Sequence, residues 1–223
     1  MSQKYYCFDR FEMLAFLPKK YNKVLEIGCG EGVFLQQLNQ MSEKWGIEPS
    51  KEAADKAVKI ADKILIGSYN DCLSQLPDEF FDLIICNDVI EHMVDYDFFF
   101  SSIKQKMSDN GCLIGSIPNV RFYKNLFNLL IKKDWLYKAE GGILDKTHVR
   151  FFTKKSFYNI LIEHNFTIDL YYGINSFVYK SASSIKSFIR IIMLSLIILI
   201  SFGWYSDIQY LQYGFKIKVN KNE

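Results

Sequence analysis

Short apolar runs and helical repeats alternate along the first half of the chain. Runs rich in Val, Ile and Leu, typical of buried strands, begin near residues 24, 44, 63, 81 and 112. Segments at 33–38, 50–60 and 96–107 have the apolar spacing of helices. This alternation favours a parallel sheet with helices on both faces. With further strands expected at 167–172 and 209–219, we predict an α/β fold: a Rossmann-like, doubly wound seven-stranded sheet with the last strand antiparallel.

Composition and charge exclude several classes of function. The net charge is +2 over 223 residues, so no global charge favours a nucleic-acid partner. The five cysteines form no C-x-x-C pair, which is typical of free thiols in a reducing cytoplasm. The N-terminus is polar and aromatic and does not have the layout of a signal peptide. We therefore expect a cytoplasmic protein of one domain.

The turn after the first strand has glycines at alternate positions, Gly28, Gly30 and Gly32, with Cys29 between the first two. Glycine suits a backbone that takes positive φ or lies close to a ligand. A dinucleotide fold would instead have G-x-G-x-x-G, with a pyrophosphate at the next helix. Glu26, at the end of the strand, would repel a pyrophosphate and suits a ligand with an ammonium group. A nicotinamide oxidoreductase is therefore disfavoured.

Polar side chains also follow the second, third and fourth predicted strands. Glu48, before Pro49, lies about twenty residues past the glycine turn, where a carboxylate can bind the two hydroxyls of a ribose. Ligands of open α/β sheets bind outside the carboxyl ends of the strands, so we expect these side chains to face the cleft of the glycine turn. The residues after the third and fourth strands are Ser68, Tyr69, Asn87, Asp88, Glu91 and His92.

Together these segments resemble class I S-adenosylmethionine-dependent methyltransferases of the ubiquinone-biosynthesis-like type, over about residues 22–172. The resemblance implies that Glu26, Gly28 and Gly30 contact the methionine moiety of S-adenosylmethionine. It also implies that Glu48 binds the ribose and that the backbone at Asn87 faces the cofactor. The Asp that usually ends the third strand and holds the adenine is replaced by Ser68, so Ser68 or Tyr69 would serve there. The full set of expected cofactor-binding residues is Glu26, Gly28, Cys29, Gly30, Gly32, Glu48, Pro49, Ser68, Tyr69, Asn87 and Asp88.

The run from Gly142 to Thr153 (Gly-Ile-Leu-Asp-Lys-Thr-His-Val-Arg-Phe-Phe-Thr) resembles a narrower subgroup found among bacterial surface-polysaccharide and glycosyl-modification genes. That resemblance implies O-methylation of a sugar or of a glycan- or lipid-linked intermediate. A small aromatic or quinone-like hydroxyl and a non-catalytic cofactor-binding module are open alternatives. The chain would then divide into a leading helix (1–20), a cofactor-binding half (22–118), an insertion that forms a lid between the fifth and sixth strands (119–150) and a C-terminal part (151–223).

Methyl transfer to a hydroxyl requires alignment of the acceptor and removal of its proton. Histidine is the natural base near neutral pH, and His148 is the first choice, with Asp145 or Arg150 orienting it or the acceptor. A structural hydrogen bond within the insertion is the alternative role of His148. His92 is the second choice, and His164 is expected to interact with the carbonyls at a helix end.

In ubiquinone-type O-methyltransferases a Glu-x-x-Glu-His cluster is associated with a divalent metal. Residues 88–92 keep that spacing with Asp in place of the first Glu. Asp88, Glu91 and His92 could therefore hold a hard ion such as magnesium. The alternative, which we favour, is that Glu91 and His92 steady the next helix without a metal.

An apolar helix is expected at 185–203, because residues 191–206 carry no charge. This run is short of the roughly twenty apolar residues that span a bilayer. Lys180, Lys186 and Arg190 on one side and Trp204-Tyr205 on the other suit a peripheral membrane contact through 185–205. Packing on the sheet and a homodimer contact are the alternatives.

Overall fold

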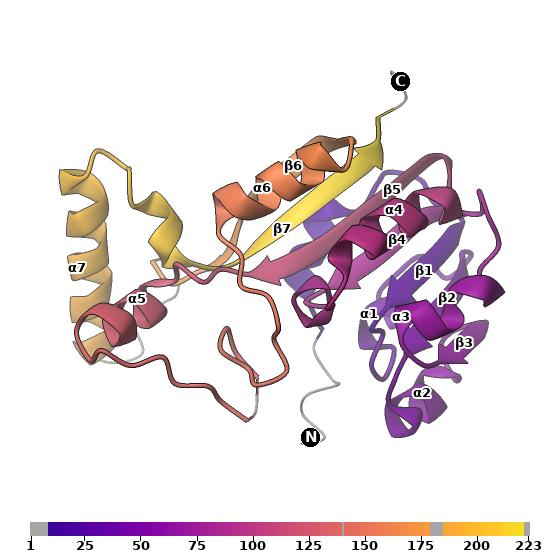
Figure 1. Ribbon diagram of the computed structural model, residues 1–223, viewed down its shortest axis with the longest axis horizontal. Coiled ribbons are helices and arrows are strands. Elements are labelled where there is room, and N and C mark those ends of the chain that lie inside the picture. The colour runs from indigo at the N-terminus through magenta and orange to yellow at the C-terminus, as the bar shows by residue number, and fades with distance from the viewer. Residues whose placement is uncertain (1–8, 140, 179–184, 221–223) are drawn as a thin grey trace.

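The computed structural model describes residues 9–139, 141–178 and 185–220 (Figure 1). Its centre is a seven-stranded sheet in the order β3-β2-β1-β4-β5-β7-β6. Neighbouring strands among β1 to β5 pair in parallel, whereas β7 runs antiparallel to both of its neighbours. The strands are β1 (Lys23–Ile27), β2 (Glu43–Glu48), β3 (Lys63–Ile66), β4 (Phe81–Asn87), β5 (Met107–Pro118), β6 (Phe166–Ser176) and β7 (Tyr210–Val219). The predicted Rossmann-like fold is confirmed.

Both faces of the sheet are covered, which explains why the central strands β1 and β4 are buried at nearly every position. On one face Leu25 belongs to a core with Phe99, Phe100 and Phe157 from the helices. On the other face the preceding residue of the chain, Val24, packs in a core with Phe34 and Leu35. The helices are α1 (Val33–Gln36), α2 (Lys51–Ala57), α3 (Tyr69–Cys72), α4 (Tyr96–Lys106) and α6 (Lys154–Glu163), and the 3-10 helices are η2 (Phe11–Phe16), η3 (Leu73–Gln75) and η4 (Ile90–His92).

Helix starts follow the side chains that can cap them. The Ser50 hydroxyl accepts a hydrogen bond from the Ala53 N–H at the start of α2. Thr153 and Ser156 form a reciprocal capping box at the start of α6. Ser68 forms such a box with Asp71 and starts α3, which explains why β3 ends at Ile66 and not at residue 68.

The leading segment differs from the long amphipathic helix that its apolar spacing predicts. The described part is the short 3-10 helix η2, and Phe8 lies outside the described residues. Arg10, just before it, has a left-handed backbone with a φ of 50°, which an α-helix does not accommodate. Met13 and Phe16 are nevertheless fully buried, so this segment does pack on the sheet.

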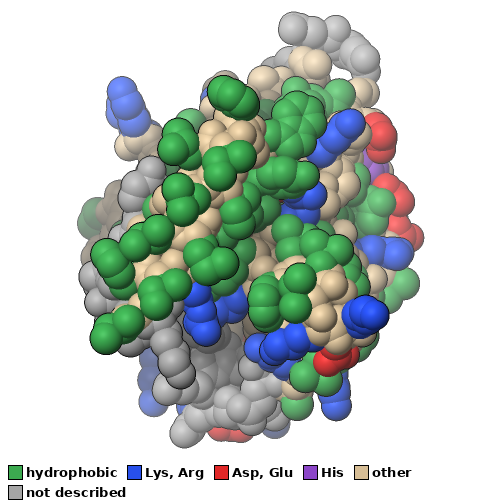
Figure 2. All heavy atoms as spheres, turned by 90° about the vertical axis from the view of Figure 1, so that its left-hand side faces the viewer, with side chains coloured by type: hydrophobic (Ala, Val, Ile, Leu, Met, Phe, Trp, Pro, Cys, Tyr) green, Lys and Arg blue, Asp and Glu red, His purple; other side chains and the backbone are tan. Residues whose placement is uncertain are grey.

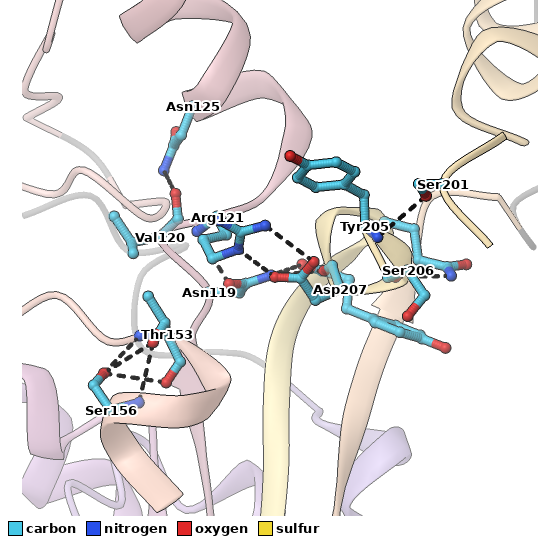
Figure 3. Close-up of polar contacts among 12 residues, drawn as sticks. Asn119, Val120, Arg121, Asn125, Thr153, Ser156, Ser201, Tyr205, Ser206 and Asp207 are labelled. Carbon is cyan, nitrogen blue, oxygen red and sulfur yellow. Dashed lines mark hydrogen bonds and ion pairs between the residues drawn. The ribbon is translucent and has the colours of Figure 1, made fainter. Parts of the chain in front are cut away.

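The insertion between β5 and β6 contains α5 (Tyr123–Leu130) and then runs irregularly to α6. Figure 3 shows how its base is fixed: the buried Asn119 amide donates to the carbonyls of Asp207 and Tyr210, at 2.9 Å each, and Arg121 pairs with the Asp207 carboxylate. Asp207 lies in η5 (Ser206–Gln209), which leads from α7 (Ile185–Ile200) into β7. The insertion that contains α5 and the segment that contains α7 and η5 are therefore bonded to each other where they leave the sheet.

Gly115 in β5 tests how tightly the central strands pack. A Cβ there would lie 2.3 Å from the Cys86 carbonyl oxygen and 2.6 Å from the Phe215 ring. We expect Gly115→Ala to lower the free energy of unfolding by roughly 1–3 kcal/mol or more, because backbone on one side cannot move away. Chemical denaturation measures this loss, with Ser74→Ala at an exposed position as the control. An unchanged midpoint for Gly115→Ala would contradict the packing described.

Candidate active site

A cavity of about 880 Å³ lies at the carboxyl ends of β1, β2 and β4. Segments far apart in the chain line it: the glycine turn, residues 48–50, the segment after β4, the start of the leading segment, and the insertion at 141–148. The expected residues that line it are Glu26, Gly28, Cys29, Gly30, Glu48, Pro49, Asn87, Asp88, Glu91, His92, Asp145 and His148. Gly32, Ser68, Tyr69 and Arg150 do not line it.

The backbone of the glycine turn is held against β2. The N–H groups of Gly28 and Cys29 both donate to the Ile47 carbonyl, at 2.8 and 3.1 Å. Gly28 has a φ of +71°, and a Cβ on it would lie 2.7 Å from a methyl of Val89. Glycine at this position thus permits both the turn and the close approach of the segment after β4.

Gly32 and Cys29, in the same turn region, serve packing. Gly32, with a φ of 80°, precedes α1, and its Cα faces Ile60 and Ala57. The Cys29 thiol lies over Gly46, where a Cβ would approach it to 2.6 Å. Burial, and then the neighbouring carboxylates, raise the pKa of the Cys29 thiol well above its usual range, so this cysteine stays protonated. It therefore offers backbone, and not thiolate, to the cavity.

Two buried carboxyl groups stand beside the turn. Glu48 accepts hydrogen bonds from the N–H groups of Gly30 (2.9 Å) and Ser50 (2.8 Å), so it joins the end of β2 to the turn. One oxygen of Glu26 is buried without a hydrogen-bond partner. Burial, followed by the proximity of Glu48, raises the pKa of Glu26 well above its usual range, and burial also raises the pKa of Glu48. A cationic ligand would stabilise the ionised forms of this pair.

The segment after β4 contributes one open amide and one fully engaged carboxylate. Both polar atoms of the Asn87 side chain are buried without a partner. Asp88 has a φ of 54°, and its carboxylate accepts from Ser116 (2.7 Å) and Gln212 and pairs with Arg10. Asn87 is thus available to a ligand, whereas the oxygens of Asp88 are already held by the protein.

Glu91, His92 and His148 form a compact acid–imidazole cluster in the cavity wall. The two imidazole rings meet edge to face with their centroids 4.6 Å apart, and Nε2 of His148 lies 3.9 Å from a Glu91 oxygen. Each Nδ1 faces a carbonyl oxygen, of Ile143 for His148 (2.9 Å) and of Thr147 for His92 (3.2 Å). A carbonyl only accepts, so each Nδ1 carries the proton and each Nε2 keeps a lone pair.

Glu91 is the least satisfied member of this cluster. It is 1% exposed, and neither carboxyl oxygen has a hydrogen-bond partner. Burial, and then Asp88, raise the pKa of Glu91 well above its usual range, while burial and the charge of His148 lower the pKa of His92. A neutral Glu91 carboxyl beside a neutral His92 ring can relay a proton near neutral pH.

Neither the Asp145 carboxylate nor the Arg150 side chain forms a hydrogen bond with the His148 ring in the described part of the chain. Burial opposes ionisation of Asp145, but hydrogen bonds from Thr147 and Gly141 outweigh it and lower its pKa. Its carboxylate shapes the loop that carries His148. The Arg150 side chain is exposed, points out of the cavity and donates to the Val94 carbonyl (2.8 Å) beside the Tyr96 ring. The backbone N–H of Arg150 donates to the Glu91 carbonyl.

The residues expected near the adenine are placed elsewhere. Ser68 is exposed and committed to its capping box with Asp71. Tyr69 is buried under α4, where its hydroxyl lies 3.0 Å from that of Ser102 and its ring meets Phe99 edge to face. The turn that starts α3 directs both side chains away from the cavity.

Among the described residues, the metal candidates are Glu91, His92 and His148, whose ligand atoms lie within 4.8 Å of one another. His148 takes the place expected for Asp88, since Asp88 is engaged with Arg10 and Ser116. The orphaned oxygens of Glu91 and the two free Nε2 atoms fit a divalent ion. Two imidazoles with one carboxylate are more typical of zinc or another transition metal than of magnesium.

Several lining residues carry no local signal that would have identified them. Arg10, Gln212 and Asn175 form a polar chain with Asp88, since the Asn175 amide donates to Gln212 (2.9 Å) and to Glu12 (3.0 Å). Asn175 and Gln212 lie in strands β6 and β7, whose pattern predicts only sheet. Their partners are up to 163 residues away, so local spacing does not reveal these contacts.

Comparisons with known proteins agree with this geometry. A family model described as "Methyltransferase domain" matches residues 2–171. The chain is 30% identical over 101 residues to the ubiquinone biosynthesis O-methyltransferase of Bradyrhizobium diazoefficiens (44% of this chain, 40% of that protein), and 27% identical over 152 residues to that of Rickettsia typhi (66% and 60%). The matched stretches thus span 40–60% of the length of these relatives.

The fold also matches solved structures. The crystal structure of a SAM-dependent methyltransferase from Archaeoglobus fulgidus superposes with a TM-score of 0.62, covering 93% of this chain and 90% of that one. The two sequences are 19% identical, so this likeness shows the fold alone.

Gly28→Ala tests whether the glycine turn binds S-adenosylmethionine. The added methyl would clash with Val89 and strain a positive φ, and we expect S-adenosylhomocysteine affinity to fall at least tenfold. Calorimetric titration of wild type and variant with S-adenosylmethionine, S-adenosylhomocysteine and NAD measures this, with Gly203→Ala, which meets no atom within 4 Å and lies outside the cavity, as the control for strain at positive φ. Tight binding of NAD by the wild type, or unchanged affinity in Gly28→Ala, would contradict the assignment of the turn.

Glu91→Gln tests the buried carboxyl through pH. The folded-state pKa of Glu91 is raised, so as pH rises above the ordinary carboxyl range the unfolded chain releases a proton that the folded protein keeps, and stability falls. Gln has no such proton. We therefore expect Glu91→Gln to be more stable than wild type by a few degrees in Tm at pH 8 and by less at pH 5. Glu163→Gln, on the exposed face of α6, should show no such trend; the same trend there would count against the role of burial.

Proposed function

The chain belongs to the class I S-adenosylmethionine-dependent methyltransferases, and from that premise we propose that it O-methylates a sugar or a glycan- or lipid-linked intermediate. S-adenosylmethionine is the methyl donor. The relatives named for ubiquinone biosynthesis O-methyltransferase activity support a hydroxyl acceptor. The four described cysteines, all buried and free, favour a reducing compartment such as the cytoplasm for this reaction.

The observation that carries the proposal is the position of His148. Its Nε2 keeps a lone pair, faces the unpartnered Glu91 and lies in the wall of the same cavity as Glu26, Gly28 and Glu48. Donor and base would therefore share one enclosed space of a size typical of ligand sites. An acceptor hydroxyl beside Nε2 would have a route for its proton.

S-adenosylmethionine, when bound, supplies a methyl group on a positively charged sulfur. The acceptor oxygen forms the new bond to carbon as the carbon–sulfur bond breaks, and the hydroxyl proton passes to Nε2 of His148. The carboxyl group of Glu91, 3.9 Å away and kept neutral by its raised pKa, would place its dipole beside the imidazolium that results. The Ile143 carbonyl holds Nδ1–H and keeps the ring in the required tautomer. If a divalent ion binds, Glu91, His92 and His148 would hold it, and it would lower the pKa of a bound hydroxyl.

The lining of the cavity favours a sugar over a flat aromatic acceptor. Among the described lining residues Phe34 is the sole Phe, Tyr or Trp. Polar side chains are numerous, and Asn87 offers both a buried donor and a buried acceptor without partners. A polyhydroxyl ligand can satisfy such groups, whereas a quinone-like ring would leave them unpaired.

His148→Gln tests catalysis separately from binding. We expect kcat to fall about 10²- to 10⁴-fold, the usual contribution of a general base, while the Kd for S-adenosylhomocysteine changes less than threefold. His92→Gln should lower kcat by a smaller factor. Methyl transfer from labelled S-adenosylmethionine to a panel of nucleotide sugars, glycans and catechols measures both, with His164→Gln, whose ring faces Asp97 on the helical side, as the control.

Each outcome of this experiment separates the alternatives. Transfer to catechols but not to sugars would replace the sugar acceptor by an aromatic one. Cofactor binding with no transfer to any hydroxyl acceptor would favour a non-catalytic module. Full activity of His148→Gln would assign His148 to the structure of the insertion.

A further inference from the structure

Apolar side chains gather on one face of the molecule, away from the sheet. Figure 2 shows them over the side on which α5 and α7 lie in Figure 1, with Lys and Arg side chains between and around them. We call this face the outer surface. Its exposed apolar residues are Phe127, Leu129, Leu130, Ile131, Ile185, Phe188, Ile189, Ile192, Met193, Leu196, Ile197, Leu199, Ile200, Phe202, Trp204 and Tyr205.

This exposure is unusual for a helix that belongs to a core. Leu194 is the sole residue of α7 that is buried among those described, and no residue of α7 belongs to a hydrophobic core cluster of the described chain. Ile200 is 75% exposed and Trp204 82%. A contiguous apolar face of this extent marks a site of interaction with a protein or a membrane.

The charge pattern identifies the occupant. The sequence has no Asp or Glu between Asp109 and Asp134, which contains α5, or between Asp169 and Asp207, which contains α7. The same stretches carry Lys124, Lys132, Lys133 and Arg190. Apolar residues bordered by cations, with Trp and Tyr at one end of the helix, match the boundary between headgroups and acyl chains of an anionic bilayer.

The length of the helix decides how it would lie. Its 16 residues rise about 24 Å, less than the hydrocarbon core of roughly 30 Å. No helix in the described ranges is long and apolar enough to cross a membrane. An orientation in the plane of the interface fits both the length and the wide apolar exposure.

A second copy of the chain fits the outer surface less well. In a twofold dimer the outer surface of one chain would contact the outer surface of the other. The cations of the two chains would then face each other, and these stretches contain no Asp or Glu to pair with them. Anionic lipid headgroups would neutralise them instead.

We propose that the outer surface docks on an anionic membrane, with α7 lying in the interface. The ion pair between Arg121 and Asp207 and the hydrogen bond from Asn119 to η5, drawn in Figure 3, hold the segment that contains α5 to the segment that contains α7. The helices α5 and α7 would therefore dock as one unit. η5 continues into β7, where Leu211 and Gln212 line the cavity. The outer surface and the cavity thus adjoin through a few residues of chain.

Co-sedimentation with lipid vesicles tests the proposal without relying on catalysis. We expect the wild type to bind vesicles of phosphatidylcholine with about one third phosphatidylglycerol at least tenfold better than pure phosphatidylcholine, and less at high salt. Leu196→Glu with Leu199→Glu should abolish binding, and Lys132→Gln with Lys133→Gln should weaken it several-fold. Matched controls at the far end of the sheet are Val58→Glu, also an exposed apolar position, and Lys51→Gln with Lys59→Gln.

Two further measurements keep the result decisive. Calorimetric binding of S-adenosylhomocysteine checks that every variant is folded, so loss of vesicle binding is attributed to the surface. Light scattering measures oligomeric state. Equal binding of wild type and Leu196→Glu/Leu199→Glu to anionic vesicles would overturn the proposal. So would a wild type that does not bind vesicles but forms a dimer, if these substitutions dissociate that dimer.

Discussion

The whole site depends on how the backbone after β1 is held against the end of β2. Two N–H groups of the turn converge on the Ile47 carbonyl, and a third, from Gly30, donates to the Glu48 carboxylate. These bonds require positive φ at the glycines and leave no room for a side chain at Gly28, where Val89 approaches from the segment after β4. A single local geometry thereby brings the ends of three strands together around one cavity.

Several buried carboxyl groups surround that turn, and they outnumber the basic side chains beside them. Glu26, Glu48 and Glu91 are all buried, and burial is the first cause of the raised pKa of each. Buried carboxyl oxygens without hydrogen-bond partners, as in Glu26 and Glu91, are costly to stability. Such a cost is typical of functional sites, where ligand charge compensates it, and S-adenosylmethionine carries both an ammonium and a sulfonium.

The insertion supplies what the sheet cannot. The sheet positions the residues expected to bind S-adenosylmethionine, whereas His148, the proposed base, comes from the loop between α5 and α6, which is attached to the segment after β4. The Glu91 carbonyl accepts from the N–H groups of Val149 and Arg150, and Asp145 organises the turn before them. His148 is consequently positioned by backbone contacts on both sides of it. The same insertion contributes α5 to the outer surface, so one segment connects the cavity wall and the proposed membrane contact.

Local sequence determined the strands, the caps at Ser50 and Thr153, and the presence of Glu26, Gly28, Glu48, Asn87, His92 and His148 at one edge of the sheet. It could do so because strand periodicity, glycine turns and capping depend on neighbouring residues, and parallel strands share one carboxyl edge. Tertiary structure alone decided that Tyr69 packs under α4, that Arg150 points outward, and that Arg10 and Gln212 occupy the Asp88 carboxylate. These contacts join residues far apart in the chain, and side-chain direction beyond a turn follows from packing, which no local pattern encodes.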